Sequence, residues 1–155
     1  MTRTALLLPL LAWLSGMLAA CGHAPISAPA PAAVNRAADV ALSQVGRPYR
    51  FGGNSPRGFD CSGLVQYSYA RAGIQLPHGT DSLRRVTYPV PSDRIRRGDL
   101  VFFHQEGKHA SHVGIYLGDD KFVHAPSSGK SVHVVPFNDP YWRRNFAGAR
   151  RLDVD

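Results

Sequence analysis

The sequence predicts an α+β domain in which helices come first and an antiparallel sheet follows. Before residue 87, apolar residues recur at helical spacing between glycine- and proline-rich loops. From Leu100 onward, short β-branched and aromatic segments alternate with turns. The 155 residues, 44% of them hydrophobic, suffice for one packed domain plus a leader or tail. We therefore expect N-terminal helices packed on a five- to six-stranded antiparallel sheet.

The first twenty residues have the pattern of an export signal. Arg3 precedes the apolar stretch 5–14, and small residues follow up to Ala20. This stretch is shorter than the roughly 20 apolar residues that a membrane-spanning helix needs. The sequence Leu-Ala-Ala-Cys at 18–21 resembles the lipobox of bacterial lipoproteins, which implies a signal peptide over 1–20 and lipidation of Cys21. The alternative is a plain secretory signal followed by an incidental cysteine.

A spacer is expected between this leader and the domain. Residues 22–35 contain three prolines and no charged side chain, a composition typical of an extended tether. We therefore divide the chain into a signal peptide at 1–20, a lipidated cysteine with its tether at 21–35, and a domain at 36–155.

Three helices are expected in the first half of the domain. Asn35 can cap a helix that ends at Gly46. An irregular loop at 47–59 follows, and Asp60 stands at the N-cap of a helix over 61–72, which places Cys61 in its first turn. Residues 79–86 predict a short third helix.

Five strands are expected in the second half, because β-branched and aromatic residues dominate these segments. They are 100–104, 111–117, 121–125, 131–137 and 146–152. Gly-Asp-Asp at 118–120 predicts a tight turn between the second and third strands.

Charge and cysteine content exclude several classes of protein. Lys and Arg outnumber Asp and Glu by 18 to 11, so the net charge of +7 predicts an anionic partner. Two cysteines cannot build a disulfide-rich scaffold or a four-cysteine zinc site. The histidines lack a metal-ligand spacing, so we expect no metal and no cofactor. Without a basic arm, we expect no nucleic-acid partner.

Cys61 is the candidate nucleophile. If Cys21 carries lipid, Cys61 has no intramolecular partner, and it is either an inert core residue or a reactive thiol. A helix N-terminus stabilises a thiolate and offers N–H groups to an oxyanion. His112 and His124 lie on the two strands joined by the turn at 118–120, where we expect them nearly opposite each other, as a base and the group that orients it. Each alone is more often a satisfied core histidine than a catalyst, and the case rests on their combination with Cys61.

Five ordered motifs resemble those of NlpC-type (NlpC/P60) peptidases, which are papain-like cysteine hydrolases of bacterial cell-wall peptides. The motifs are Phe-Asp-Cys-Ser-Gly-Leu-Val at 59–65, Gly-Arg-Pro-Tyr-Arg-Phe-Gly-Gly at 46–53, Arg-Gly-Asp-Leu-Val-Phe-Phe at 97–103, Ser-His-Val-Gly-Ile-Tyr at 111–116 and Phe-Val-His-Ala at 122–125. The resemblance covers residues 36 to about 152 and implies a papain-like fold.

The resemblance also implies roles for individual residues. Cys61 would be the nucleophile, His112 the general base that also protonates the leaving amine, and His124 the third polar residue that fixes the imidazole. Tyr49 would assist the oxyanion hole. Asp60 and Ser62 would engage the substrate amine, although Asp60 is equally explained as a helix cap. His78 departs from the arginine usual in the family's Leu-Pro-Arg segment.

We therefore expect a monomeric peptidoglycan endopeptidase that cleaves stem peptides or their cross-links through a thioacyl-enzyme. D,L- and D,D-endopeptidase activities both stay open. The protein would be lipid-anchored at Cys21, and Gly22 favours the outer membrane, facing the periplasm. The alternatives are a non-catalytic module that binds cell-wall peptides, and an acyl- or amidotransferase of the same fold.

Overall fold

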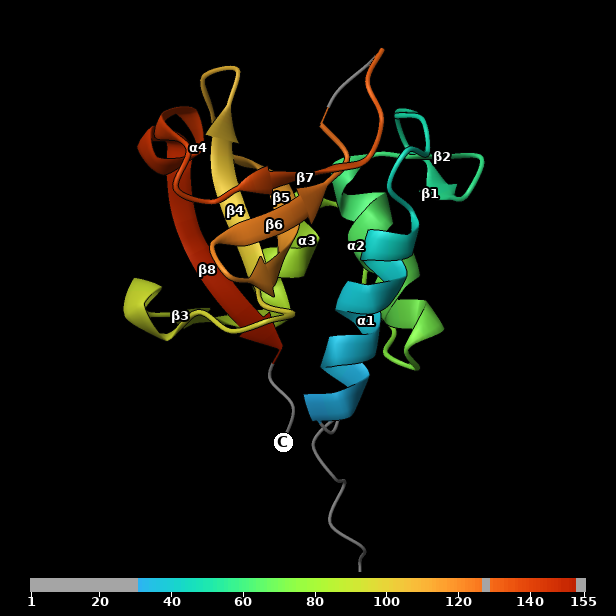
Figure 1. The fold of residues 1–155 in the computed structure, drawn as a ribbon, viewed down its shortest axis with the longest axis horizontal. Helices are drawn as coiled ribbons and strands as arrows, with labels where there is room; N and C mark the ends of the chain where they lie inside the picture. The colour runs from blue at the N-terminus through green and yellow to red at the C-terminus, as the bar shows by residue number, and fades with distance from the viewer. Residues whose placement is uncertain (1–30, 127–128, 153–155) are drawn as a thin grey trace, which may run out of the picture.

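The computed structural model describes residues 31–126 and 129–152, in which the first three helices pack on one face of a six-stranded sheet (Figure 1). In chain order the elements are α1 (Pro31–Ser43), β1 (Asn54–Ser55), β2 (Gly58–Phe59), α2 (Cys61–Arg71), α3 (Thr80–Arg85), β3 (Thr87–Val90), η1 (Ser92–Arg94), β4 (Leu100–Gln105), β5 (Lys108–Gly118), β6 (Lys121–His124), β7 (His133–Pro136), α4 (Pro140–Asn145) and β8 (Phe146–Leu152). The predicted α+β class is confirmed.

The sheet runs in the order β3-β8-β4-β5-β6-β7, and every neighbouring pair is antiparallel. All five predicted strands form, within a few residues of the predicted ends. The sixth strand, β3, was not predicted. It has four residues, one of them Pro89, and it pairs only with β8. A proline is tolerated there because an edge strand leaves one side of its backbone unpaired.

The predicted start of the first helix is wrong. Helix α1 begins at Pro31, so residues 31–35 are helical instead of part of an extended tether, and Asn35 is an exposed residue within the helix. Proline suits a first helical turn, and alanine is the best helix former. Ala33 is buried, so packing adds to this propensity. The predicted signal peptide and Cys21 lie outside the described residues.

The two faces of the sheet carry different cores. Helices α1 and α2 cover the first face, where the packed residues include Ala37, Leu64, Val113 and Ile115. The second face holds a separate cluster rich in aromatic side chains, built around Phe103 and Phe122, Trp142, Phe137 and Phe146. Among the described residues, no helix is long and apolar enough to cross a membrane.

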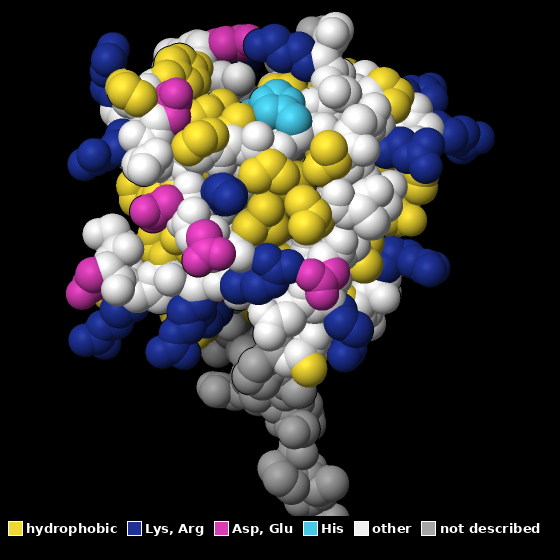
Figure 2. Space-filling view, viewed as in Figure 1, with side chains coloured by type: hydrophobic (Ala, Val, Ile, Leu, Met, Phe, Trp, Pro, Cys, Tyr) yellow, Lys and Arg dark blue, Asp and Glu magenta, His cyan; other side chains and the backbone are white. Residues whose placement is uncertain are grey.

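Charged side chains are dispersed over the surface. On the face that bears β6, β7 and α1, Figure 2 shows lysine and arginine side chains spread around the rim, with acidic side chains between them and an apolar patch near the centre. The positive charge on this face therefore acts as a diffuse field and does not form a single basic stripe.

Helix α2 is fixed at both of its ends, by a contact to the segment before β4 at one end and by its own cap at the other. Near its C-terminal end, the buried hydroxyl of Tyr69 donates a hydrogen bond to the carbonyl oxygen of Gly98, just before β4. At the other end, Asp60 caps the helix as predicted, accepting a hydrogen bond from the amide of Gly63 at 2.7 Å. The position of Cys61 relative to the sheet depends on these contacts.

Gly63 is required by a close backbone approach. A Cβ atom at this position would lie 1.9 Å from the carbonyl oxygen of Gly53, which also accepts a hydrogen bond from the amide of Asp60 at 2.9 Å. The loop before β1 therefore lies directly against the first turn of α2. Any side chain at residue 63 would push the loop and the helix apart.

We predict that Gly63→Ala destabilises the protein, although alanine favours an ordinary helix by about 1 kcal/mol. The added methyl group meets a backbone carbonyl, and overpacking of this kind costs about 1–3 kcal/mol. Urea denaturation measures the difference. Arg71→Ala, which changes an exposed residue of the same helix, is the control and should stay within about 0.5 kcal/mol of the unmodified protein. An unchanged or raised stability of Gly63→Ala would show that the loop moves away freely.

Candidate active site

His112 and His124 meet on the aromatic face of the sheet. Ile115 pairs with Val123, so continuing this register sets His124 beside Gly114, and the two histidines are diagonal neighbours. The expectation that they lie nearly opposite each other is thus off by two residues, but both side chains share one face. Nε2 of His112 lies 2.7 Å from Nδ1 of His124, and the exposed fractions of the two residues are 1% and 0%. The predicted contact between the imidazoles is present.

A third imidazole, which the sequence analysis left without a role, continues this arrangement. His133 on β7 pairs directly with His124 on β6. Nε2 of His124 lies 3.3 Å from Nε2 of His133, and Nδ1 of His133 lies 2.8 Å from the carbonyl oxygen of Ser131. The three rings form a continuous hydrogen-bonded row that ends on a backbone carbonyl.

Trp142 covers the first two imidazoles. Its ring stacks on His112 with a centroid distance of 5.7 Å and an interplanar angle of 26°, and it meets His124 at 4.9 Å and 85°. Helix α4, which carries Trp142, was not predicted. Its signal was the Asp-Pro pair at 139–140, because Asp139 caps the helix and proline occupies its first turn.

Burial governs the protonation of His112 and His124. Burial lowers the pKa of His112 to about 4. The pKa of His124 is also lowered, chiefly by burial and further by His112, His133 and Lys130. Both rings are therefore neutral at neutral pH. A neutral imidazole has one nitrogen with a free lone pair and can act as a base.

Cys61 begins α2, as predicted, and its thiol is also neutral in the free protein. Burial raises the pKa of Cys61 to about 11, against hydrogen bonds from the backbone amides of Val113, Ser62 and Cys61 itself, which lower it, while the negative charge of Asp60 raises it. The helix N-terminus thus acts in the predicted direction, but burial outweighs it. A base must take the proton from this thiol before sulfur becomes a strong nucleophile.

Cys61 and His112 line one pocket together with Tyr49. The other lining residues are Gln105, Glu106, Lys108, Ser111 and Pro126. Among the described residues, no hydrogen bond joins the sulfur of Cys61 to His112. Such contacts are often long in an empty site and tighten when substrate binds.

Tyr49 reaches the pocket from the loop before β1. Its amide donates a hydrogen bond to the carbonyl oxygen of Lys130 at 2.8 Å, which ties the loop to the segment leading into β7. Burial raises the pKa of Tyr49, and the nearby Cys61, Asp60 and Glu106 raise it further. The phenol is therefore a hydrogen-bond donor at neutral pH, as an oxyanion-hole residue must be.

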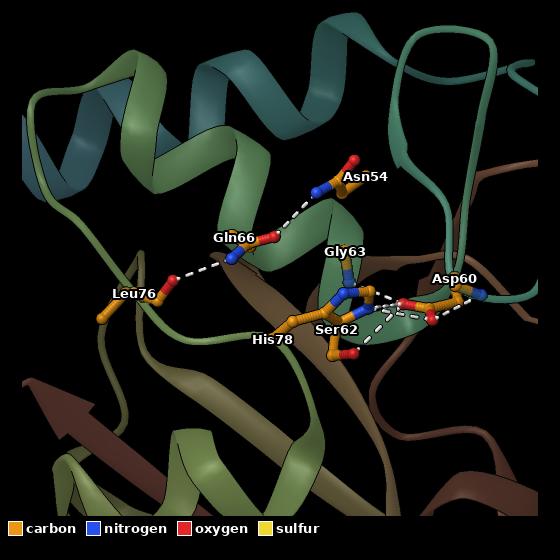
Figure 3. Close-up of polar contacts among 8 residues, drawn as sticks. Asn54, Asp60, Ser62, Gly63, Gln66, Leu76 and His78 are labelled. Carbon is orange, nitrogen blue, oxygen red and sulfur yellow. Dashed lines mark hydrogen bonds and ion pairs between the residues drawn. The ribbon is translucent and has the colours of Figure 1, made fainter.

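Asp60, the residue before Cys61, is the centre of a hydrogen-bonded cluster (Figure 3). Besides the amide of Gly63, its carboxylate accepts hydrogen bonds from the amide of Gly52 at 3.0 Å and from the hydroxyl of Ser62 at 3.1 Å. Ser62 is buried. The capping role of Asp60 is confirmed, whereas the contacts of Asp60 and Ser62 with a substrate amine stay predictions.

His78 supplies the last partner of this carboxylate. Its Nε2 lies 2.9 and 3.0 Å from the two oxygens of Asp60. The loop that carries His78 is held by Gln66 of α2, which donates a hydrogen bond to the carbonyl oxygen of Leu76 (Figure 3). The side-chain oxygen of Gln66 in turn accepts a hydrogen bond from the side chain of Asn54. The sequence marked His78 only as a departure from the family arginine, and the structure gives it a partner in the cap.

We predict that acid destabilises the fold through His112. Its pKa is about 4 in the folded protein and about 6.5 when exposed, so below pH 6.5 the unfolded chain binds a proton that the folded chain excludes. The stability contribution is complete above pH 6.5 and is lost as the pH falls towards 4. At pH 5 the loss is about 2 kcal/mol for this residue.

Urea denaturation at pH 7.5 and pH 5 measures this loss. His112→Gln keeps a polar side chain that does not titrate, so its stability should fall by about 2 kcal/mol less between the two pH values. Equal losses in both proteins would show that His112 is not held neutral by the fold.

Two known proteins are similar to this chain over more than two thirds of its length. The chain is 38% identical to murein DD-endopeptidase MepH of Escherichia coli over 143 residues, which cover 89% of this chain and 51% of the relative. It is 38% identical to a gamma-D-glutamyl-L-lysine dipeptidyl-peptidase of Bacillus cereus over 109 residues, which cover 69% of this chain and 33% of the relative. The chain therefore spans about half or less of the length of these relatives.

A solved structure and a family model both match most of the domain. A crystal structure of an NlpC/P60 family protein from Bacillus cereus matches with a TM-score of 0.72 and 33% identity, covering 82% of this chain and 41% of that one. The family model described as NlpC/P60 matches residues 46–151. This range begins at the turn after α1 and ends one residue before the end of β8, and the chain therefore belongs to the NlpC/P60 family.

Proposed function

We propose that this protein is a peptidoglycan endopeptidase that uses Cys61 as its nucleophile and His112 as its general base. The observation that carries the proposal is the pocket that Cys61 and His112 line together, with Nε2 of His112 already engaged by His124. The nitrogen of His112 that is left free is the one available to the thiol. Relatives named as a murein endopeptidase and as a peptidase of γ-D-glutamyl-L-lysine support the substrate class.

The proposed reaction passes through an acyl-enzyme. His112 takes the proton of the Cys61 thiol while sulfur bonds to the carbonyl carbon of the scissile amide. The resulting oxyanion accepts hydrogen bonds from Tyr49 and from backbone amides at the start of α2. His112 then gives its proton to the departing amine as the C–N bond breaks. Water, deprotonated by His112, hydrolyses the thioester and restores the thiol.

Electrostatics suit an acidic wall polymer. Arg47 and Arg50 are exposed on the loop that carries Tyr49, and Arg57 is exposed in the turn between β1 and β2. The whole chain has a net charge of +7. Stem peptides carry free carboxylates, so this field would raise their local concentration near the pocket. We propose cleavage within stem peptides or at their cross-links, by D,L- or D,D-endopeptidase action.

Two other functions of the same fold make different predictions. A module that only binds wall peptides has no need of a thiol and an imidazole in one pocket. An acyl- or amidotransferase would pass the acyl group to an added amine in preference to water. Product analysis with and without a competing amine separates transfer from hydrolysis.

We predict that the chain from Gly22 onward releases muropeptides from purified sacculi, and that Cys61→Ser lowers this rate by about 10³-fold or more, because a serine hydroxyl at this site is a much weaker nucleophile than a thiol. Mass spectrometry of the released fragments identifies the bond. Arg71→Ala is the control for handling and should retain full activity. A folded unmodified protein that releases nothing would refute the hydrolase.

We also propose that Cys21 is lipidated and anchors the protein in the bacterial envelope, at the outer membrane and facing the periplasm. The residues that support this are the apolar stretch 5–14, the Leu-Ala-Ala-Cys sequence at 18–21 and Gly22. The enzyme would act as a lipid-anchored monomer on the wall above the membrane.

We predict that Cys21→Ser abolishes incorporation of labelled palmitate and releases the protein from the membrane fraction. The released Cys21→Ser protein should cleave purified sacculi as fast as the unmodified protein does. Lipid labelling and membrane fractionation measure the two effects. Continued labelling of Cys21→Ser would place the lipid elsewhere and refute this anchor.

A further inference from the structure

We propose that His133, held by the carbonyl oxygen of Ser131, is a positioning residue that sets which nitrogen carries the proton in His124 and His112. The inference rests on the proposed function, because it concerns the base of that reaction. Its basis is the hydrogen-bonded row of three imidazoles that ends on Ser131.

The carbonyl oxygen of Ser131 sets the direction in which hydrogen bonds are donated along the three imidazoles. A carbonyl oxygen can only accept a hydrogen bond, so Nδ1 of His133, 2.8 Å from the oxygen of Ser131, must carry the proton. In its neutral form His133 has only this one N–H, so its Nε2 is an acceptor. The neighbouring Nε2 of His124, 3.3 Å away, must therefore be the donor.

The same logic passes through His124 to the base. With its proton on Nε2, neutral His124 offers Nδ1 as an acceptor. Nε2 of His112, 2.7 Å away, must donate to it, which leaves Nδ1 of His112 without a proton. This is the nitrogen free to take the proton of Cys61. The carbonyl of Ser131 thus determines, through two other rings, that His112 is a base.

His124 needs such a partner because its own chemistry does not choose a direction. An imidazole can present either a donor or an acceptor to His112, unlike a carboxylate, which only accepts. If His124 presented a donor, His112 would have to accept at Nε2 and would carry its proton on Nδ1, where it could not deprotonate the thiol. Selection between these two patterns requires a third group of fixed character.

The surroundings of His124 leave this task to His133. His124 has no exposed surface, and its other ring neighbours are Phe122 and Trp142. Neither the phenyl ring nor the indole ring makes a hydrogen bond to it among the described residues. A metal ion could also order three histidines, but no cluster of His, Cys, Asp or Glu in the described part of the chain has the arrangement of a metal site.

Two variants separate positioning from packing. His133→Gln keeps an amide oxygen that can accept from His124 and an NH₂ group that can donate to Ser131. His133→Leu fills the space but can do neither. In the chain from Gly22 onward, we expect His133→Leu to lower kcat on sacculus-derived muropeptides by about 10–100-fold, with KM nearly unchanged. His133→Gln should recover most of this loss of kcat.

The direct test is the position of the protons. Two-bond ¹⁵N–¹H spectra of the folded, histidine-labelled protein distinguish Nδ1–H from Nε2–H. We expect Nε2–H in His112 and His124 of the unmodified protein and in His133→Gln, and a mixture of both forms in His133→Leu. A proton on Nδ1 of His112 in the unmodified protein would overturn the proposal, as would an unchanged pattern in His133→Leu.

The spectra also separate this proposal from the proposed function. If the unmodified protein cleaves no peptidoglycan but shows the expected pattern, the endopeptidase fails while the role of His133 stands. If it cleaves and shows the opposite pattern, only the role of His133 fails. Should His133→Leu not fold, the spectra of the unmodified protein and of His133→Gln still decide.

Discussion

A hydrogen bond between two buried imidazoles organises the aromatic face of the sheet. His112 and His124 contact each other at 2.7 Å with almost no exposed surface, under the ring of Trp142. Because a dry environment disfavours a charged imidazole, the same packing that holds the rings in place keeps them neutral. Position and protonation state therefore have one cause, which is the aromatic layer built from Phe103, Phe122 and the side chains around them.

Burial also determines the protonation state of the Cys61 thiol, but it shifts the pKa in the opposite direction. Burial raises the pKa of Cys61, whereas it lowers that of His112, so both residues are uncharged before substrate arrives. The amides at the start of α2 are positioned to stabilise negative charge, but they do not create it in the free protein. In the proposed reaction, charge would separate only when a substrate carbonyl can receive it, which would limit reactions of the thiol with other electrophiles.

Local signals in the sequence were sufficient for most of the domain. The strands from Leu100 onward follow from their β-branched and aromatic composition, and the cap at Asp60 follows from a short polar residue before an apolar helix. Helix α4 with its Trp142 was missed because its six residues show no helical period, although α3, which is equally short, was predicted. The strand β3 was missed because Pro89 argues against a strand except at an edge, and edges are known only once the sheet is assembled.

The partners of the site residues were harder to predict than the residues themselves. Cys61, His112 and Tyr49 stand in recognisable motifs and line one pocket. His78 and His133 act through contacts set by tertiary structure. His78 meets a carboxylate 18 residues earlier, and His133 depends on the register between β6 and β7, which no two-residue turn determines. The register shift between Tyr116 and Gly118 is a further example, because the pairing of Gly118 with Lys121, continued without it, would set His124 opposite Ile115 and turn it away from His112.

The segment 130–133 supports both sides of the pocket at once. The carbonyl oxygen of Lys130 holds the amide of Tyr49, Val132 exchanges backbone hydrogen bonds with Gly46 and Arg47, and the next residue is His133. A slip of one residue in this segment would turn His133 to the opposite face and release Tyr49 in the same step. Tyr49 and the row of three imidazoles thus depend on the same backbone segment. A displacement of this segment would disturb both at once, and in the proposed enzyme it would abolish activity completely.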